Sequence, residues 1–119
     1  MPKTVLIVED NALNMKMMND QLQANGHKTI QSIDGSDVMV LVKEHRPDLI
    51  VMDIQLPGIS GLELTQMLKA DDELKHIPVI AVTALAMKGD EQKLLEAGCD
   101  VYVAKPISVA GFQATVSNI

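Results

Sequence analysis

The sequence predicts an α/β fold of the doubly wound class, in which helices cover both faces of a parallel sheet. Short apolar runs rich in β-branched residues alternate along the chain with segments whose apolar residues follow a helical spacing. Turn-forming residues punctuate this alternation at Gly26, Pro47, Pro78 and Gly98. Because strictly alternating strands and helices need right-handed crossovers, five such βα units predict one parallel sheet.

The expected elements follow from local patterns, taken in order. Four apolar runs favour buried central strands: TVLIV (4–8), LIVM (49–52), VIAV (79–82) and DVYV (100–103). HKTIQSI (27–33) alternates more and favours an edge strand. Helices are expected to begin near Ala12, Gly35, Ser60, Lys88 and Ser108. Ser60 and Glu63 have the spacing of a capping box, so we interpret Ser60 as structural.

Size and composition restrict the class of protein. A chain of 119 residues predicts one domain, and a net charge of −6 disfavours binding to nucleic acid or to an anionic membrane. No apolar stretch approaches the roughly 20 residues that span a bilayer, and no signal peptide is recognisable, so we expect a cytoplasmic protein. We also expect it to be a monomer. A single cysteine, Cys99, excludes an internal disulfide. The three histidines, His27, His45 and His76, lack metal-ligand spacing and are expected at the surface.

Polar residues follow the expected strands at their carboxyl ends. Glu9 and Asp10 follow the first strand, Asp53 follows the third, Thr83 ends the fourth, and Lys105 comes just after the fifth. In a doubly wound sheet these strand ends form the ligand site. Three carboxylates in one crevice favour a hard cation, and few carboxylates plus water favour Mg2+ over Ca2+.

Each of these signals has a plainer interpretation when it is taken alone. The acidic pair could be a solvated strand end or a helix cap, and Thr83 could reflect only β propensity. Lys105 followed by Pro106 could be only a turn. Convergence at one sheet edge is what favours a site.

The segments VLIVEDN, LIVMDIQLPGISG, VIAVTA and VYVAKP, together with their spacing, resemble the receiver domain of bacterial two-component response regulators. The resemblance covers the whole chain. EDNALNMK, MDIQLPGISGLE and AMKGDE are especially similar to the single-domain receivers that control cell division. The resemblance implies a (βα)5 fold of strand order 2-1-3-4-5, a receiver domain spanning residues 1–119 and no output domain.

The resemblance also implies residue roles. Asp53 would accept a phosphoryl group from a phosphohistidine donor. Asp10 would bind Mg2+ directly, Glu9 would bind it mainly through water, and the backbone carbonyl of Gln55 would complete the protein ligands. Glu9, Asp10, Asp53 and Gln55 would thus form the metal site.

Other residues are assigned to the phosphoryl group and to signalling. Thr83 and Lys105 would contact the phosphoryl oxygens, and the small Ala84 would leave that group accessible. Tyr102 lies where the family carries its switch aromatic. Partners would be a sensor histidine kinase or a histidine phosphotransfer protein, plus a downstream protein.

The first helix has more apolar residues than one core face requires. Leu13, Met15, Met17, Met18 and Leu22 spread over an arc of roughly 200° at 3.6 residues per turn. Met17, Met18 and Leu22 are expected in the core. Met15, at one margin, either protrudes as a docking contact for a kinase or joins the core.

Two other functions compete with phosphorelay signalling. A Mg2+-dependent phosphohydrolase would also form an aspartyl phosphate, but such enzymes usually carry a second Asp two residues beyond the nucleophile, where this chain has Gln55. A flavodoxin-type nucleotide or flavin binder would need a first loop with amides free for phosphate. EDNAL supplies carboxylates there instead.

Overall fold

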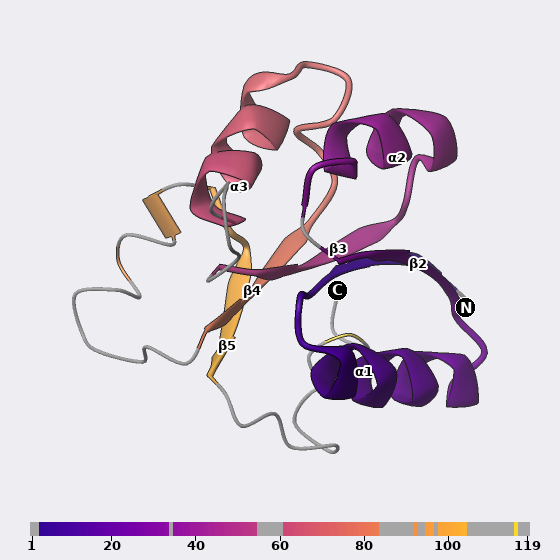
Figure 1. Ribbon diagram of the computed structural model, residues 1–119. Helices are drawn as coiled ribbons and strands as arrows, with labels where there is room; N and C mark the ends of the chain where they lie inside the picture. The colour runs from indigo at the N-terminus through magenta and orange to yellow at the C-terminus, as the bar shows by residue number, and fades with distance from the viewer. Residues whose placement is uncertain are drawn as a thin grey trace.

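The computed structural model describes residues 3–33, 35–54, 61–83, 92, 95–96, 98–104 and 116, with residues 83 and 104 in their backbone only. Strands and helices alternate along this part of the chain (Figure 1). They are β1 (Thr4–Val8), α1 (Ala12–Ala24), β2 (Lys28–Ser32), α2 (Val38–His45), β3 (Leu49–Asp53), α3 (Gly61–Ala70), β4 (Val79–Thr83) and β5 (Val101–Ala104).

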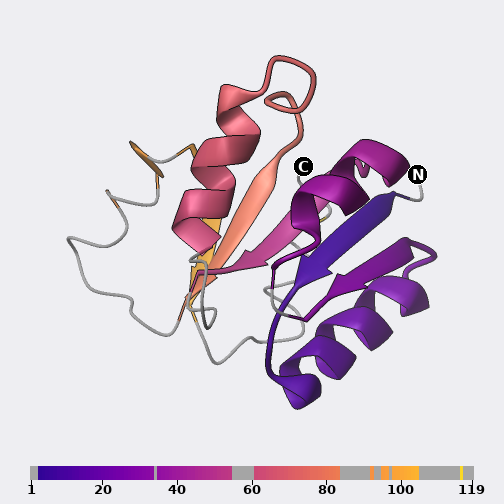
Figure 2. The ribbon, with the colours of Figure 1, turned by 45° about the horizontal axis from the view of Figure 1, so that its top comes forward.

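The five strands form one sheet of order β2-β1-β3-β4-β5, and every neighbouring pair is parallel. In Figures 1 and 2, α1 covers one face of the sheet, and α2 and α3 cover the other. The predicted doubly wound fold and its strand order are therefore confirmed.

Two apolar cores lie on the two faces of the sheet. Because side chains alternate along a strand, Val5 and Ile7 of β1 pack under α1, whereas Leu6 and Val8 pack under α2 and α3. β1 and β3 are buried almost throughout, with Thr4 alone half-buried. This double-sided burial explains why both strands are continuous β-branched or aliphatic runs rather than alternating ones.

The edges of the sheet match one expectation and correct another. β2 lies at an edge, as its alternating pattern predicts. β5 occupies the other edge, and Val101, Tyr102 and Val103 are only half-buried, so the prediction of a central strand at 100–103 is wrong. An edge strand can be as apolar as a central strand when both of its faces pack against the core. The side chains of a strand point to the two faces of the sheet, so their apolar character does not depend on how many neighbouring strands are hydrogen bonded.

Helix boundaries agree with the sequence signals in most places. α1 begins at the expected Ala12, whereas α2 begins at Val38, because turn residues occupy positions 35 to 37. α3 begins at Gly61, and Ser60, the expected cap, lies outside the described residues. The helix starts expected near Lys88 and Ser108 also lie outside them.

No helix in the described part of the chain has both the length and the apolar character needed to cross a bilayer.

Candidate functional site

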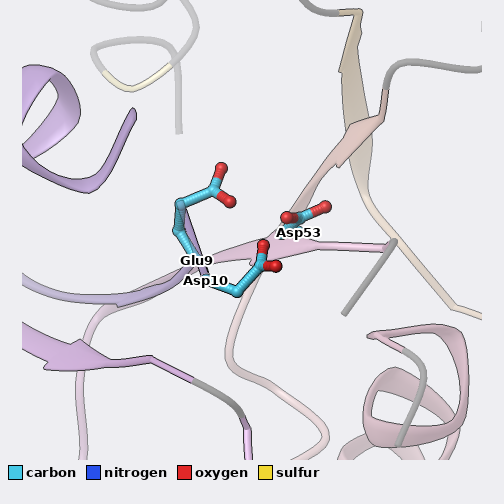
Figure 3. Close-up of side chains that lie close together, drawn as sticks. All are labelled: Glu9, Asp10 and Asp53. Carbon is cyan, nitrogen blue, oxygen red and sulfur yellow. The ribbon is translucent and has the colours of Figure 1, made fainter. Parts of the chain in front are cut away.

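The ends of β1 and β3 bring three carboxylates together. Val8 of β1 pairs with Met52 of β3, so Glu9 and Asp53 each follow at the same level on adjacent strands. One carboxylate oxygen from each of Glu9, Asp10 and Asp53 lies within 4.8 Å of the others. Figure 3 shows the three carboxyl groups around one shared space. The convergence predicted for these residues is confirmed.

Backbone hydrogen bonds hold the two acidic residues after β1 in place. The Glu9 amide donates to the Ser32 carbonyl at 3.0 Å, which extends the β1–β2 ladder by one residue. The Asn11 amide donates to Oε2 of Glu9 at 3.3 Å, so the chain turns back toward the Glu9 carboxylate. Asn11 then caps α1, because its Oδ1 accepts from the Asn14 amide at 3.0 Å. The turn therefore fixes Glu9 before the helix begins.

The three carboxylates differ in exposure. Glu9 is 1% exposed and Asp53 is 2% exposed, whereas the Asp10 residue is exposed. Charges of one sign at this separation repel each other, and burial of two of them makes the repulsion stronger. A divalent cation removes this penalty, and an all-oxygen donor set with one solvent-facing carboxylate suits a hard cation that keeps several waters. The residues present therefore fit Mg2+.

A groove of about 440 Å³ runs from this site along α1 and the edge strand β2. Glu9 and Asp10 line its end at the site, and Met15, Lys16 and Ile33 are among the residues along it. The groove therefore gives access from solvent to two of the three carboxylates, those of Glu9 and Asp10.

The other predicted site residues fall at or beyond the limit of the described chain. Thr83 ends β4 and pairs with Ala104 of β5, one residue past the Val82 that pairs with Asp53. The backbone of Thr83 therefore lies next to the site, as predicted from its strand. Gln55, Ala84 and Lys105 lie outside the described residues. Their roles stay predictions.

Comparison with known proteins agrees with this geometry. Residues 5–117 match the response regulator receiver domain. The chain belongs to this family.

Curated relatives include response regulators of the same domain size. The polar-differentiation response regulator DivK of Brucella anthropi is 58% identical over 118 residues, which is 99% of this chain and 96% of that protein. The protein of the same name from Brucella ovis is 56% identical over the same shares. Receiver domains act in two-component phosphorelay signalling, and the chain is a signalling protein of this kind.

Solved receiver structures superpose closely on this one. A response regulator from Chloroflexus aurantiacus has a TM-score of 0.93 at 27% identity, covering 99% of this chain and 97% of that one. The receiver domain of the sensor histidine kinase PA1611 from Pseudomonas aeruginosa has a TM-score of 0.89 at 31% identity, with the same coverage. That structure contains a magnesium ion coordinated in the active site cleft.

Tyr102 of the receiver domain sits on the edge strand β5, opposite Ala81 of β4. It is half-buried and packs against the core on the α2 and α3 face. A half-buried aromatic side chain at a sheet edge has room to change its position, so the geometry is compatible with the switch role predicted for it.

Of the two positions considered for Met15, the structure shows the one in the core. Met15 is 6% exposed and belongs to the core between α1 and the sheet, together with Met18 and Leu22. The reason is that α1 lies over β2 as well as β1: the Asn19 and Gln23 side chains both hydrogen bond to Thr29 of β2. This widens the buried face of the helix to include Met15.

A docking role for Met15 therefore lacks the exposure on which it was based. Leu13, at 75% exposure, is the large apolar residue of α1 that is exposed. Met17 is half-buried, at the other margin of the core face.

Of the histidines, His45 and His76 are exposed as predicted, whereas His27 is half-buried and accepts a hydrogen bond from the Lys3 amide.

Sequence reasoning missed two features beside the site. The buried Ser32 hydroxyl donates to Oδ1 of Asp37 and accepts from the Gly35 amide, which ties the chain after β2 close to Glu9. Gly61, at the start of α3, contacts the backbone of Asp53. In the sequence, Ser32 and Gly61 are visible only as small residues close to the end of a strand. Such residues are common in turns, so their contacts with the site are recognised only in the folded structure.

Cys99 is a buried free cysteine. Burial raises the pKa of its thiol, and its Sγ lies 3.8 Å from the Thr65 hydroxyl. A raised pKa leaves less thiolate at pH 8, so we expect iodoacetamide to modify the folded protein roughly tenfold or more slowly than the urea-unfolded chain. Mass spectrometry over time measures both rates, and equal rates would show that the thiol is accessible in the fold.

Proposed function

We propose that Asp53 is the phosphoacceptor of this receiver domain. A carboxylate oxygen of Asp53 attacks the phosphorus of a phosphohistidine on a partner protein, the phosphorus–nitrogen bond breaks, and the histidine leaves with the electron pair of that bond. The product is an acyl phosphate on Asp53. The observation that carries the proposal is the position of Asp53, at a parallel strand end within 4.8 Å of two further carboxylates.

The metal ligands that we propose are those implied by the family resemblance. We assign Asp10 as the direct protein ligand of Mg2+ with Asp53, Glu9 as a ligand acting mainly through water, and the Gln55 backbone carbonyl as the remaining ligand. The bound ion shields negative charge as the carboxylate and the phosphoryl group approach. The Glu9 carboxylate already accepts a hydrogen bond from the Asn11 amide, which favours contact with the ion through water over direct ligation. The magnesium ion in the active site cleft of the PA1611 receiver supports Mg2+ as the ion.

Thr83 and Lys105 are proposed to contact the phosphoryl oxygens. Thr83 supplies a hydroxyl donor and Lys105 a compact positive charge, which together stabilise the added negative charge. Ala84, which has a small side chain, would leave the group open to its donor and to water. Tyr102 would respond to Thr83 on the neighbouring strand.

The biological role we propose is cell-division or cell-cycle control. It rests on the polar-differentiation regulators that are up to 58% identical to this chain. The partners are a sensor histidine kinase or a histidine phosphotransfer protein and a downstream protein, with the receiver acting as a cytoplasmic monomer. A net charge of −6 supports protein and cation partners over nucleic acid. A phosphohydrolase function is not favoured, because the family and the close relatives are response regulators.

Mg2+ affinity tests the ligand order. We expect Glu9→Gln to weaken Mg2+ binding about tenfold, the size typical of an indirect ligand, and Asp10→Asn to weaken it more. Titration by amide chemical shifts or by Tyr102 fluorescence measures both affinities. Asp20→Asn is the matched control, because Asp20 lines the same groove and loses the same charge but is absent from the carboxylate cluster. Equal losses at Glu9 and Asp10 would contradict the assignment.

Phosphorylation by a small donor tests the function itself. The protein is incubated with Mg2+ and acetyl phosphate, and we expect one hydroxylamine-labile phosphoryl group per molecule, as an acyl phosphate requires. Multiple-turnover release of phosphate from small phosphoesters would favour the phosphohydrolase instead.

A further inference from the structure

The first residue of α3 touches the end of β3. The Gly61 amide donates to the carbonyl of Ile54 at 3.3 Å, and Gly61 is buried. Because β3 ends at Asp53, the chain leaves the sheet at the proposed phosphoacceptor and returns to the same place when α3 begins. Figure 2 shows the first turn of α3 beside the tip of β3.

This approach leaves no room for a side chain at position 61. A Cβ on Gly61 would lie 2.8 Å from Cα of Ile54, 3.0 Å from the carbonyl carbon of Asp53, and closer still to the Asp53 carbonyl oxygen. All three are backbone atoms, which cannot rotate away as the end of a flexible side chain can. Any larger residue therefore has to separate α3 from the backbone of Asp53.

Thr65, one turn further along α3, forms a hydrogen bond with Gly61. The Thr65 hydroxyl donates to the Gly61 carbonyl at 2.8 Å, and the Thr65 side chain is fully buried. The Cys99 thiol in turn donates to the Thr65 hydroxyl at 3.8 Å. Thr65 thus fixes the Gly61 carbonyl within α3, while the Gly61 amide joins the helix to Ile54.

We propose that Gly61 and Thr65 are positioning residues for the phosphoacceptor, acting by close contact between α3 and the Asp53 backbone. The inference rests on the proposed function of Asp53. The Asp53 carboxylate is carried by the Cα next to the contacted carbonyl, so a shift of that backbone moves the attacking oxygen. In-line attack on phosphorus is sensitive to such shifts, and a displacement of about 1 Å can cost about 100-fold in rate.

The test compares two glycine-to-alanine variants. Gly61→Ala is compared with Gly98→Ala, whose Cβ would meet Cγ of Lys69 at 2.6 Å and whose φ of +109° is also strained for alanine. Gly98 precedes β5, at the opposite end of the sheet from Asp53, so its substitution reports general destabilisation. The rate of phosphorylation by acetyl phosphate at saturating Mg2+ is measured well below each melting temperature, together with Mg2+ affinity.

We expect Gly61→Ala to lower the phosphorylation rate about 100-fold and to weaken Mg2+ binding about tenfold, whereas Gly98→Ala changes neither. The proposal would be overturned if Gly61→Ala were phosphorylated at the wild-type rate, or if both variants lost the same factor in phosphorylation rate. If Gly61→Ala does not fold, the nearly isosteric Thr65→Val decides: a severalfold slower rate in the folded variant supports the proposal, and an unchanged rate overturns it. Failure of the wild-type protein to take up phosphate would instead refute the proposed function.

Discussion

Asp53→Asn abolishes phosphorylation by acetyl phosphate or by a phosphorylated kinase, while the fold remains intact. The amide keeps the shape of the carboxylate but has no negative oxygen to attack phosphorus. Asp53 is 2% exposed and close to two other carboxylates, so the substitution also removes repulsion in the metal-free protein. We expect the free energy of unfolding without Mg2+ to stay unchanged or to rise by up to about 1 kcal/mol.

Radiolabel incorporation and urea unfolding measure the two effects. Asp72→Asn is the matched control, since it makes the same chemical change on a side chain that is 93% exposed. The control should be phosphorylated at the wild-type rate. Incorporation by Asp53→Asn at that same rate would refute the assignment of the phosphoacceptor.

Thr83→Ala uncouples the phosphoryl group from partner binding. In the wild type, we expect a beryllofluoride mimic of the phosphoryl group to draw the Thr83 hydroxyl inward and to let Tyr102 move toward the vacated space. Such a two-state shift, of about one to three kcal/mol, changes partner affinity about five- to 150-fold. Thr83 ends β4 next to the edge strand that carries Tyr102, so the relay spans only two neighbouring strands.

Affinity for a kinase that phosphorylates the protein is measured with and without the mimic. Thr83→Ala should still bind the mimic but show no gain in partner affinity, and the aromatic NMR signals of Tyr102 should stop responding. Thr4→Ala, at the opposite end of the sheet, should behave as the wild type. A full gain of affinity in Thr83→Ala would remove Thr83 from the relay.

The strands of the sheet and the carboxylate cluster were predictable because they depend on local chemistry. Strands buried on both faces must be apolar throughout, which marks β1, β3 and β4 in the sequence. The carboxyl ends of parallel strands lie at one edge of the sheet, and the pairing of β1 with β3 brings Glu9 and Asp53 together there. The strand order came from the family resemblance, because alternation alone leaves several orders open.

The remaining features depend on tertiary contacts. Met15 is buried because α1 also covers β2, and helical periodicity does not state how many strands a helix covers. Gly61 matters through a backbone contact with Asp53 that no spacing in the sequence encodes. β5 lies at an edge although its residues are apolar, because Tyr102 packs against the core on one face of the sheet and Val101 and Val103 pack against the core on the other.

Locating the acyl phosphate on the wild-type chain tests the central claim most directly. After phosphorylation with acetyl phosphate and Mg2+, borohydride reduces an aspartyl phosphate to homoserine, and peptide mass spectrometry identifies the altered residue. The account predicts homoserine at position 53 and unchanged residues at positions 9 and 10. Modification at Asp10 with Asp53 intact, or a phosphorylated protein with no reducible acyl phosphate, would contradict it.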